Sequence, residues 1–511
     1  MGIVSFYSRQ TLILLFAAII AFGGCLWGSF HFDDYSLFSG ALWRPFDIRP
    51  LTYLAFWIND ALGDSNPAGY HLLNLLLHLA AVSLFWDSLR RLVAPKAAWL
   101  AAAIFGVHPF QAEPVNYVFA RSTLLATALC LAALASWTRG RRWWAVLWFG
   151  AALLAKEECV AFPLFVLLLQ VVNLRQRTQG ESRDETFRVP PKTELMPILT
   201  MLGLSIAAGV RVLVATAQTP GSGAGAQAGI SWQSYALAQG IVILRYLRML
   251  VLPFGFTVDP DIAVPPAWLG LLAWLGVASL VLLASLRFRR MQAGFWFLGG
   301  LVLLLPSSSV LPAADLAADR RMYLPMIGFA TAAALLLQKF GPVLLGAALV
   351  LLAAVSVLRT ETWRTEAALW KDAVQKAPGK IRPKIQLARV SEPARAIALL
   401  EEAKQLAPAD ARIPAEEGRI YLNSGKPDLA LVAFGRALAL APRDAEAFNN
   451  RGAALLALDQ KQTARQDFER ALAIDPCQFD ARLNLRRLGT VRPAPARCGY
   501  STGQTRALLG N

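Results

Sequence analysis

Long apolar runs separated by short polar connections make up the first 360 residues of the chain. Runs of roughly spanning length occur at about 11–30, 70–89, 97–112, 121–138, 143–156, 159–174, 195–217, 266–286, 292–312, 322–338 and 341–358. A helix needs about 20 mostly apolar residues to cross the hydrocarbon core of a bilayer. The pattern therefore predicts an all-α fold in which a polytopic membrane helix bundle of about 11 spans occupies residues 1–360.

Basic residues at the ends of the apolar runs predict the orientation of this bundle. They cluster at 90–96, 139–142, 175–183 and 287–290. Because cytoplasmic connections are enriched in Lys and Arg, we expect a cytoplasmic N-terminus, with residues 30–70 on the far side. Residues 234–252 are also long enough to span, but Arg245 and Arg248 interrupt this apolar run. A span here would also place the basic cluster at 287–290 on the outer side of the membrane. We therefore expect an amphipathic helix in the outer interface, and an odd number of spans then places the C-terminal part outside.

A 34-residue period begins after residue 360, where the composition becomes that of a soluble helical domain. The period relates three prolines, two glycines, two phenylalanines and two alanines: Pro408, Pro442 and Pro476, Gly418 and Gly452, Phe434 and Phe468, Ala437 and Ala471. Small residues and Phe at fixed offsets with this period are typical of tetratricopeptide (TPR) repeats. We predict a small α-helical TPR solenoid over 361–490, with two good copies, a degenerate copy at about 378–408, a terminal helix near 478–488, and a flexible tail over 491–511.

Composition supports a membrane protein and excludes several other classes. The 511 residues are 56% hydrophobic and 16% charged, whereas soluble domains are about one quarter charged. The net charge is +16, and many of the Lys and Arg residues lie at the ends of apolar runs, where they indicate topology, so we expect no nucleic-acid partner. The glycine-rich segment 219–225 does not follow a predicted strand and is expected to be a flexible loop without nucleotide binding. Of the five cysteines, Cys477 and Cys498 can pair if the tail faces an oxidising compartment.

Polar stretches interrupt the apolar pattern on the predicted outer side, and the first contains Asp33 and Asp34. Adjacent carboxylates disfavour each other's ionisation, and polar groups at such a depth usually serve a site. A solvated acidic loop is the alternative. In the following span, His71, Asn74 and His78 share one helical face. Satisfied interhelical hydrogen bonds and a catalytic role both explain that face.

Three further polar stretches carry both acids and cations. After His108, we expect Glu113, Tyr117 and Arg121 along one face of a helix. Glu113 and Arg121 would form an ion pair, which the phenol of Tyr117 extends. That pair either holds two spans together or faces a substrate. Lys156, Glu157 and Glu158 separate two apolar runs. The last stretch contains Asp319, Arg320, Arg321 and Tyr323. Its two arginines break the positive-inside pattern, which suggests a bound anion such as a lipid phosphate.

We expect these acids and cations to gather at one membrane face. A base that faces an anionic leaving group suits transfer of a group from a lipid phosphate to a hydroxyl. The base takes the proton of the acceptor, and the cations stabilise the charge that develops on the departing phosphate. Since no nucleotide site is visible, a lipid-carried donor is favoured.

In these motifs the chain resembles the GT-C glycosyltransferases that use polyprenyl-phosphate sugars, and most closely the transmembrane and TPR-containing O-mannosyltransferases and their bacterial relatives. The motifs are, in order, Phe32-Asp33-Asp34, Arg49-Pro50-Leu51, His71-Leu72-Leu73-Asn74, His108-Pro109 with Glu113 and Arg121, Leu154-Ala155-Lys156-Glu157, Arg321-Met322-Tyr323-Leu324-Pro325, and the repeats.

The resemblance implies an inverting transfer from a dolichyl- or undecaprenyl-phosphate monosaccharide, with no cofactor and no required metal. Asp34 or Asp33 would be the general base, and the resemblance does not choose between them. Arg320, Arg321 and Lys156 would bind the donor phosphate, while Glu113, His108 and Arg121 would shape the pocket. The other motif residues, Arg49, His71, Glu157 and Tyr323, are further candidates for substrate binding.

The resemblance leaves the acceptor open, because the repeat array is shorter than in the animal enzymes. We expect a protein or glycan acceptor that the repeats could present. The Ala- and Arg-rich composition favours a bacterial inner-membrane protein with an undecaprenyl carrier and a periplasmic repeat domain. A membrane-anchored TPR scaffold without catalysis and a polyprenyl-linked glycan flippase or polymerase are the alternatives.

Overall fold

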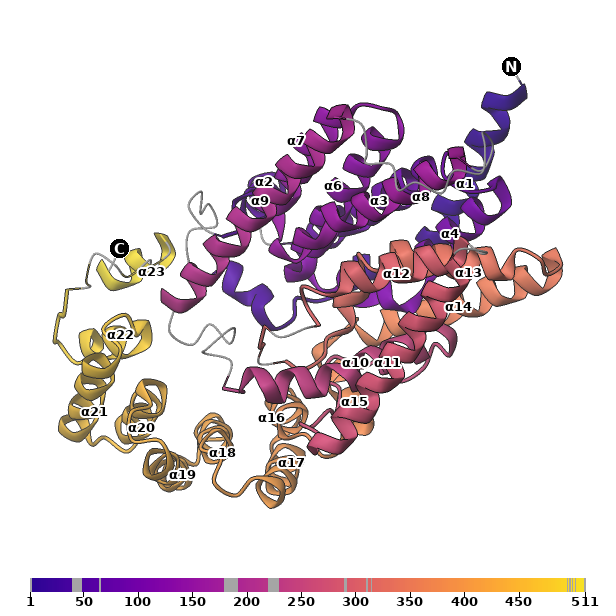
Figure 1. Ribbon diagram of the computed structural model, residues 1–511. Coiled ribbons are helices and arrows are strands. Elements are labelled where there is room, and N and C mark those ends of the chain that lie inside the picture. The colour runs from indigo at the N-terminus through magenta and orange to yellow at the C-terminus, as the bar shows by residue number, and fades with distance from the viewer. Residues whose placement is uncertain are drawn as a thin grey trace. The chain divides into compact units, whose positions relative to one another are not determined.

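A computed structural model describes residues 2–38, 48–63, 66–178, 192–218, 229–288, 292–308, 311–313, 315–493, 495, 498, 500 and 502–509, and their regular elements are helices (Figure 1). These residues divide into two compact units. The first contains the chain up to His31 and then from residue 48 to Arg364; the second contains the 3-10 helix η2 (Phe32–Phe38) and the chain from Thr365 onward. The predicted all-α fold is confirmed.

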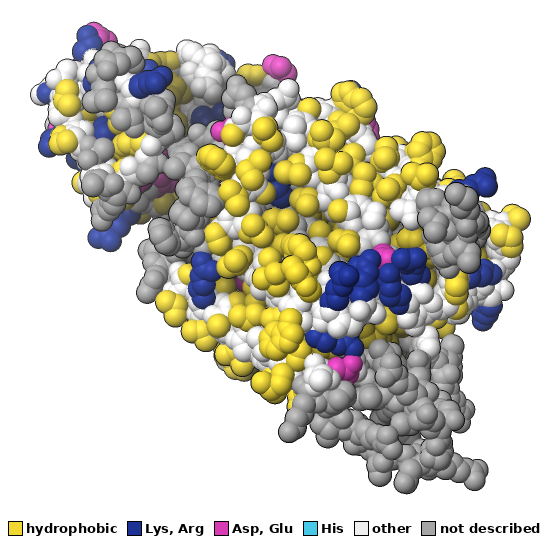
Figure 2. Space-filling model, turned by 90° about the horizontal axis from the view of Figure 1, so that it is seen from above, with side chains coloured by type: hydrophobic (Ala, Val, Ile, Leu, Met, Phe, Trp, Pro, Cys, Tyr) yellow, Lys and Arg dark blue, Asp and Glu magenta, His cyan; other side chains and the backbone are white. Residues whose placement is uncertain are grey.

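Seven stretches of the first unit are helical, long and apolar enough to cross a membrane: Arg9–Trp27, Pro67–Leu89, Val118–Thr138, Thr193–Ala217, Trp232–Val251, Ala267–Leu286 and Pro342–Thr362. They correspond to α1 (Gly2–Phe22), α3 (Pro67–Leu89), α6 (Arg121–Thr138), α9 (Lys192–Gln218), α10 (Trp232–Val251), α11 (Ala267–Phe288) and α14 (Pro342–Thr362). Hydrophobic side chains cover much of the surface seen in Figure 2. On α11, for example, Leu271, Leu275 and Leu282 are more than half exposed, as expected where a surface contacts lipid tails.

Four other apolar helices are shorter than a bilayer requires: α4 (Pro95–Val107), α7 (Arg142–Ala155), α12 (Gln292–Leu304) and α13 (Met326–Leu337). A 13-residue helix such as α4 is about 20 Å long, against a hydrocarbon core of ~30 Å. The predicted runs at 97–112, 292–312 and 322–338 are longer than α4, α12 and α13, because hydropathy counts apolar residues that continue into the turns. Irregular backbone at membrane depth is tolerated only inside the protein, so these ends mark polar positions within the bundle.

Close helix packing holds α12 against α13. Gly328 lies directly against the backbone of Gly300, and the Phe329 and Phe165 rings contact Gly300 and Gly299. Small residues of this kind let apolar helices approach closely in a membrane, where the hydrophobic effect contributes little between them. The remaining helices of this unit are α2 (Pro50–Gly63) and α8 (Phe162–Thr178).

The second unit contains the TPR helices: α15 (Glu366–Lys376), α16 (Ile381–Arg389), α17 (Pro393–Leu406), α18 (Arg412–Asn423), α19 (Pro427–Leu440), α20 (Ala445–Ala457), α21 (Lys461–Ile474), α22 (Phe479–Arg487) and α23 (Thr502–Leu509). The 34-residue period has a packing explanation. A Cβ at Gly418 would lie 2.7 Å from the Phe434 ring, and one at Gly452 would lie 2.6 Å from the Phe468 ring. Each repeat therefore needs a glycine on its first helix opposite the Phe of its second.

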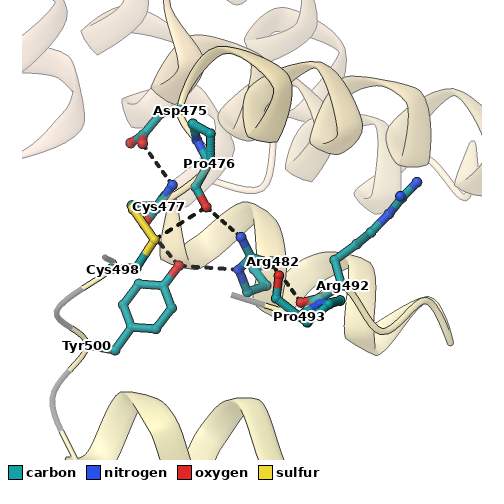
Figure 3. The surroundings of a disulfide bond; sticks show 8 residues. All are labelled: Asp475, Pro476, Cys477, Arg482, Arg492, Pro493, Cys498 and Tyr500. Atoms are coloured by element: carbon teal, nitrogen blue, oxygen red, sulfur yellow. Dashed lines mark hydrogen bonds between the residues drawn. A yellow bond between two sulfur atoms is a disulfide. The ribbon is translucent and has the colours of Figure 1, made fainter. Parts of the chain in front are cut away.

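The end of this unit is fastened back onto the last repeat (Figure 3). A disulfide joins Cys477 to Cys498, 21 residues apart. The buried Arg482 guanidinium donates to the carbonyl oxygens of Arg492 at 2.6 Å and Pro493 at 2.7 Å. These contacts, together with α23, lie in the segment that sequence analysis assigns to a flexible tail. The sequence leaves the pairing of Cys477 and Cys498 open, and the structure contains it.

Candidate active site

The two candidate bases lie in η2, which packs with the second unit. Asp34 is completely buried, whereas Asp33 is exposed. Phe32, directly before them, has a φ of 47°, in the left-handed region that bulky residues rarely adopt. Its ring meets Trp370 edge-on at 4.9 Å. Strained backbone of this kind concentrates at functional sites, so the conformation is consistent with a site at the acidic pair.

Burial raises the pKa of Tyr35, which follows the acidic pair, and the charges of Glu366 and Asp34 raise it further. Burial also raises the pKa of Glu366 itself. Asp34, Tyr35 and Glu366 therefore form an acidic neighbourhood within the second unit. Their roles in any reaction remain a prediction.

In the first unit, short turns after the short helices position a second group of charges: η3 (Pro109–Gln111), α5 (Ala112–Asn116), η4 (Val118–Ala120), η5 (Glu157–Ala161) and η7 (Asp319–Met322). Of these, η7 contacts both η3 and α5. We call the charges they gather the ionic cluster, which consists of Arg49, Glu113, Lys156, Glu157, Glu158, Arg245, Asp319, Arg320 and Arg321.

Arg49 and Glu157 form a bidentate pair in this cluster. Arg49 Nε donates to Glu157 Oε2 at 2.9 Å, and Nη2 donates to Oε1 at 2.5 Å. Thr52, in the first turn of α2, anchors this helix by donating its hydroxyl to the Ala155 carbonyl at 2.8 Å. Burial alone would raise the pKa of Glu157, but the Arg49 guanidinium lowers it to about 2. The pair is therefore ionised at neutral pH.

Lys156 lies beside that pair at the end of α7, where the backbone becomes extended. Its side chain is buried, and Nζ lies 2.7 Å from Thr123 Oγ1 and 2.8 Å from Glu158 Oε2. Arg49 and Arg320 lie close enough to act on its charge electrostatically. Lys156 thus connects two halves of the ionic cluster that are far apart in sequence.

Arg320 closes the cluster from the other side. Its backbone N–H donates to Glu113 Oε2 at 3.0 Å, and its Nη1 donates to Oε1 at 2.5 Å. Next to this pair, Arg245 of α10 binds Asp319 at 2.7 Å. Each of these arginines therefore meets a carboxylate.

Arg321 differs from the other cations of the ionic cluster. Its guanidinium donates to the Tyr235 hydroxyl at 3.2 Å and to the carbonyl oxygens of Leu316 at 3.0 Å and Asp315 at 2.7 Å. All three partners are neutral, and among the described residues it has no ion pair at hydrogen-bonding distance. The charge of Arg321 also acts on Glu158 through space and helps to lower the pKa of that carboxylate. Arg321 is therefore the cation best able to attract a further anion.

The expected ion pair between Glu113 and Arg121 is wrong. The helix breaks at Tyr117, whose backbone is extended, so Glu113 and Arg121 do not share a helical face. Arg121 is fully buried, lies over the Phe56 ring at 4.5 Å, and donates to Asn74, Asn59 and two carbonyls. These contacts hold α2, α3 and α6 together, and the substrate-binding role of Arg121 stays a prediction.

His108 and Tyr323 also have structural partners instead of an open pocket. His108 Nδ1 accepts from the Phe110 N–H at 3.2 Å and so caps η3, while Nε2 lies 3.4 Å from the Leu250 carbonyl. The Tyr323 hydroxyl lies 2.8 Å from His78 Nδ1, in the core. Both side chains are completely buried, because apolar helices pack around them on all sides. These contacts give both side chains a packing or capping role, and their substrate-binding roles stay predictions.

On the polar face of α3, two of the three residues are satisfied as interhelical packing predicts. Asn74 accepts from Arg121 at 2.9 Å, and His78 binds Tyr323 and the Gly106 carbonyl. His71 is different: it is buried, and neither ring nitrogen has a hydrogen-bond partner among the described residues. Its substrate-binding role stays a prediction.

Glu158, Asp319 and Arg245 belong to the ionic cluster but are not among the site residues that the sequence predicts, and Tyr235 accepts a hydrogen bond from Arg321 beside them. Arg245 carried a usable signal, because an arginine inside a long apolar helix needs a buried partner. The aromatic residues Trp43 and Phe46, the basic residues Arg183, Arg289 and Arg290, and the glycine-rich segment 219–225 lie outside the described residues.

Comparisons with known proteins support the resemblance. The tetratricopeptide repeat family matches residues 445–476. The chain is 31% identical over 157 residues to the mouse protein O-mannosyl-transferase TMTC3, covering 25% of this chain and 17% of that protein. It is 30% identical over 154 residues to the Caenorhabditis elegans protein O-mannosyl-transferase F38B6.6, covering 25% of this chain and 22% of that one. It is 35% identical over 162 residues to the Drosophila melanogaster protein O-mannosyl-transferase Tmtc3, covering 23% of this chain and 17% of that protein. The matches thus span about a fifth of the length of these relatives.

Proposed function

We propose that this chain is an integral-membrane GT-C glycosyltransferase that moves a monosaccharide from a polyprenyl-phosphate carrier to a hydroxyl of a protein or glycan on the extracytoplasmic face. The ionic cluster carries the proposal, because it concentrates cations within an apolar bundle and, within the part of the chain that the structure describes, gives Arg321 no ion pair with a carboxylate. The relatives named as protein O-mannosyl-transferases support the reaction class.

In the proposed reaction, Asp34 or Asp33 removes the proton from the acceptor hydroxyl. The acceptor oxygen then forms a bond to the anomeric carbon of the sugar, while the bond from that carbon to the phosphate oxygen breaks with inversion. The leaving polyprenyl phosphate carries away the electron pair. Arg321, with Arg320 and Lys156, stabilises its negative charge, and a fixed guanidinium in a low-dielectric site does so without reorganisation.

The paired carboxylates have a positioning role in this scheme. Glu113 orients Arg320 through two hydrogen bonds, and Glu157 orients Arg49 through two more. Because these pairs are already neutralised, they hold the turns in place without competing with the donor phosphate for Arg321. His71, which is buried, is a further candidate for contact with the substrate.

The Cys477–Cys498 disulfide supports an extracytoplasmic location for the repeats, since structural disulfides are rare in a reducing cytosol. We infer a bacterial inner-membrane protein whose TPR repeats face the periplasm and could present the acceptor.

The test is transfer of labelled sugar from a polyprenyl-phosphate monosaccharide to membrane acceptors by the purified full-length chain. Asp34→Asn and Asp33→Asn should differ: the variant of the true base should lose roughly 10²- to 10⁴-fold in rate, while the other keeps most activity. Asp428→Asn, which removes an exposed carboxylate from α19, is the matched control. Full transfer by the double aspartate variant would overturn the proposed mechanism.

A second set of variants tests the phosphate site separately. Arg321→Gln should lower the rate by roughly 10²- to 10³-fold, and Arg321→Lys should fall between it and the native chain, because lysine keeps the charge but not the fork of donors. Arg364→Gln, which removes an exposed arginine of the same unit, should leave the rate unchanged. An unaltered rate in Arg321→Gln would show that the donor phosphate binds elsewhere.

A further inference from the structure

A second basic group lies away from the ionic cluster, where α3 and α6 end and α7 begins. Arg90, Arg91 and Arg139 all bind the carboxylate of Asp87, at 2.6, 2.9 and 2.5 Å. Arg141, in the same turn as Arg139, is exposed and has no ion pair among the described residues. Three guanidinium groups therefore share the Asp87 carboxylate, and Arg141 adds a fourth positive charge beside them.

The turn that carries this group is fixed rather than loose. Gly140 has a φ of +78°, and the N–H groups of Arg139 and Arg141 both donate to the Ser136 carbonyl, at 3.2 and 2.9 Å. Arg142, by contrast, is already neutralised by Glu194 at 2.5 Å. Like charges held together at fixed positions repel one another, so an additional anion would stabilise the arrangement.

The surroundings of the group are those of a membrane surface. Trp143 and Trp144, in the first turn of α7, are 61% and 56% exposed, as interfacial tryptophans are. The adjacent Trp137 is buried, and its Nε1–H has no hydrogen-bond partner among the described residues. Figure 2 shows basic side chains gathered in a compact group within a largely hydrophobic surface.

Cations at helix C-termini and in cytoplasmic connections are common, and they need bind nothing. Two observations go beyond that explanation: three arginines from two separate connections converge on one carboxylate, and exposed tryptophans lie beside them. We infer that Arg90, Arg91, Arg139 and Arg141 form a binding site for the phosphate headgroup of an anionic membrane lipid, with Trp143 and Trp144 against its acyl chains. This inference does not depend on the proposed glycosyl transfer.

The experiment uses the purified full-length chain in neutral detergent, with phosphatidylglycerol as the probe and native mass spectrometry to count retained lipid. Phosphatidylglycerol should bind and zwitterionic phosphatidylcholine should not. Arg139→Gln/Arg141→Gln should weaken phosphatidylglycerol binding roughly tenfold or more, because each basic residue near a lipid surface contributes substantially to the attraction. Arg139→Lys/Arg141→Lys, which keeps both charges, should retain most of it and shows that the turn still folds.

Two controls separate this site from other basic groups. Lys339→Gln removes an exposed charge from another connection and should leave binding unchanged, as should Arg364→Gln, which removes an exposed arginine after α14. Equal binding by the double Gln variant and the native chain would overturn the inference. So would an equal loss in Lys339→Gln, or displacement of the lipid by millimolar inorganic phosphate, which would indicate a site for a soluble anion.

Discussion

Glu157 illustrates how a single buried charge depends on its partner. In the folded chain its pKa is about 2, against an ordinary value of 4.5, because Arg49 holds the carboxylate ionised. A depressed pKa means that the folded state binds protons less readily than the unfolded state. The stabilisation is therefore complete above about pH 4.5, and it is lost as the pH falls toward 2.

We therefore predict that the thermal midpoint of the full-length chain declines as the pH falls below about 4.5. Glu157→Gln should lower the midpoint at pH 7, because a half-buried arginine left without its carboxylate costs roughly 1–3 kcal/mol, and it should make the acid decline shallower. Unfolding of the detergent-solubilised protein, followed from pH 7 to pH 3, measures both effects. The exposed Glu361→Gln serves as control. A native-like midpoint in Glu157→Gln at pH 7 would count against the pair.

The sequence predicted which residues carry charge into the bundle, but not which of them meet. Arg49 and Glu157 are 108 positions apart, so no periodicity connects them. The sequence pattern predicts an ion pair between Glu113 and Arg121 only if one continuous helix contains both residues. The extended backbone at Tyr117 removes that geometry, and Glu113 pairs with Arg320 instead. The hydropathy pattern of the sequence shows directly that a polar group lies at membrane depth. Its hydrogen-bond or ion-pair partner depends on tertiary packing, which that pattern does not contain.

Helices were predicted more reliably than side-chain partners, because apolar runs and repeat periods are local signals. The TPR glycines are an example: Gly452 and Phe468 recur 34 residues after Gly418 and Phe434 because each pair must fit together. The ends of the short helices were missed, as in the run at 97–112, where α4 ends at Val107. Apolar residues continue into the turn there, and hydropathy does not distinguish a buried turn from a helix.

This packing predicts opposite effects for two glycine-to-alanine substitutions in neighbouring helices. At Gly452 an added Cβ would lie 2.6 Å from the Phe468 ring, so Gly452→Ala should destabilise the repeats by roughly 1–3 kcal/mol. At Gly435 in α19 a Cβ would meet nothing within 4 Å, so Gly435→Ala should be neutral or stabilise by up to about 1 kcal/mol. Hydrogen exchange of α20 and α21 in the full-length chain measures the difference. Equal protection in both variants would contradict the explanation of the period.

For the molecule as a whole, the disulfide makes the location of the repeats testable. Cys477 and Cys498 should resist a thiol reagent in intact cells until a reductant is added, whereas Cys25, Cys130 and Cys159 are buried and should react only after denaturation. The expected result follows from pairing in an oxidising compartment. Labelling of Cys477 and Cys498 without reductant would place the repeats in a reducing compartment instead.

The number of crossings depends on α10. By length and composition Trp232–Val251 could span, yet its polar groups bind a segment that sequence analysis places outside. Tyr235 donates to the Ser307 carbonyl at 2.9 Å, Gln239 donates to that of Leu316 at 3.1 Å, and Arg245 pairs with Asp319. These contacts favour a helix that follows the outer loop, as the interfacial assignment expects.

Connectivity gives an independent argument. Lys96 Nζ donates to the Phe340 carbonyl at 3.3 Å, so the connection after α3 and the connection after α13 lie on the same side. An even number of crossings must separate them. If α4, α6, α7, α8, α9, α11, α12 and α13 each cross once, as the sequence predicts, the number of crossings among the described helices is even only when α10 does not cross.

Cysteines introduced singly at Lys96, Lys339 and Lys461, with Cys477 and Cys498 replaced by serine, test this topology. Lys96→Cys and Lys339→Cys should react only after the inner face is made accessible, because both lie in connections predicted to be cytoplasmic. Lys461→Cys, in α21, should react with an impermeant reagent from outside, since only α14 separates it from Lys339. Opposite accessibility of Lys96→Cys and Lys339→Cys would require α10 to cross. In that case Asp33 and the ionic cluster would no longer share a predicted face, and transfer from a lipid phosphate could not proceed as proposed.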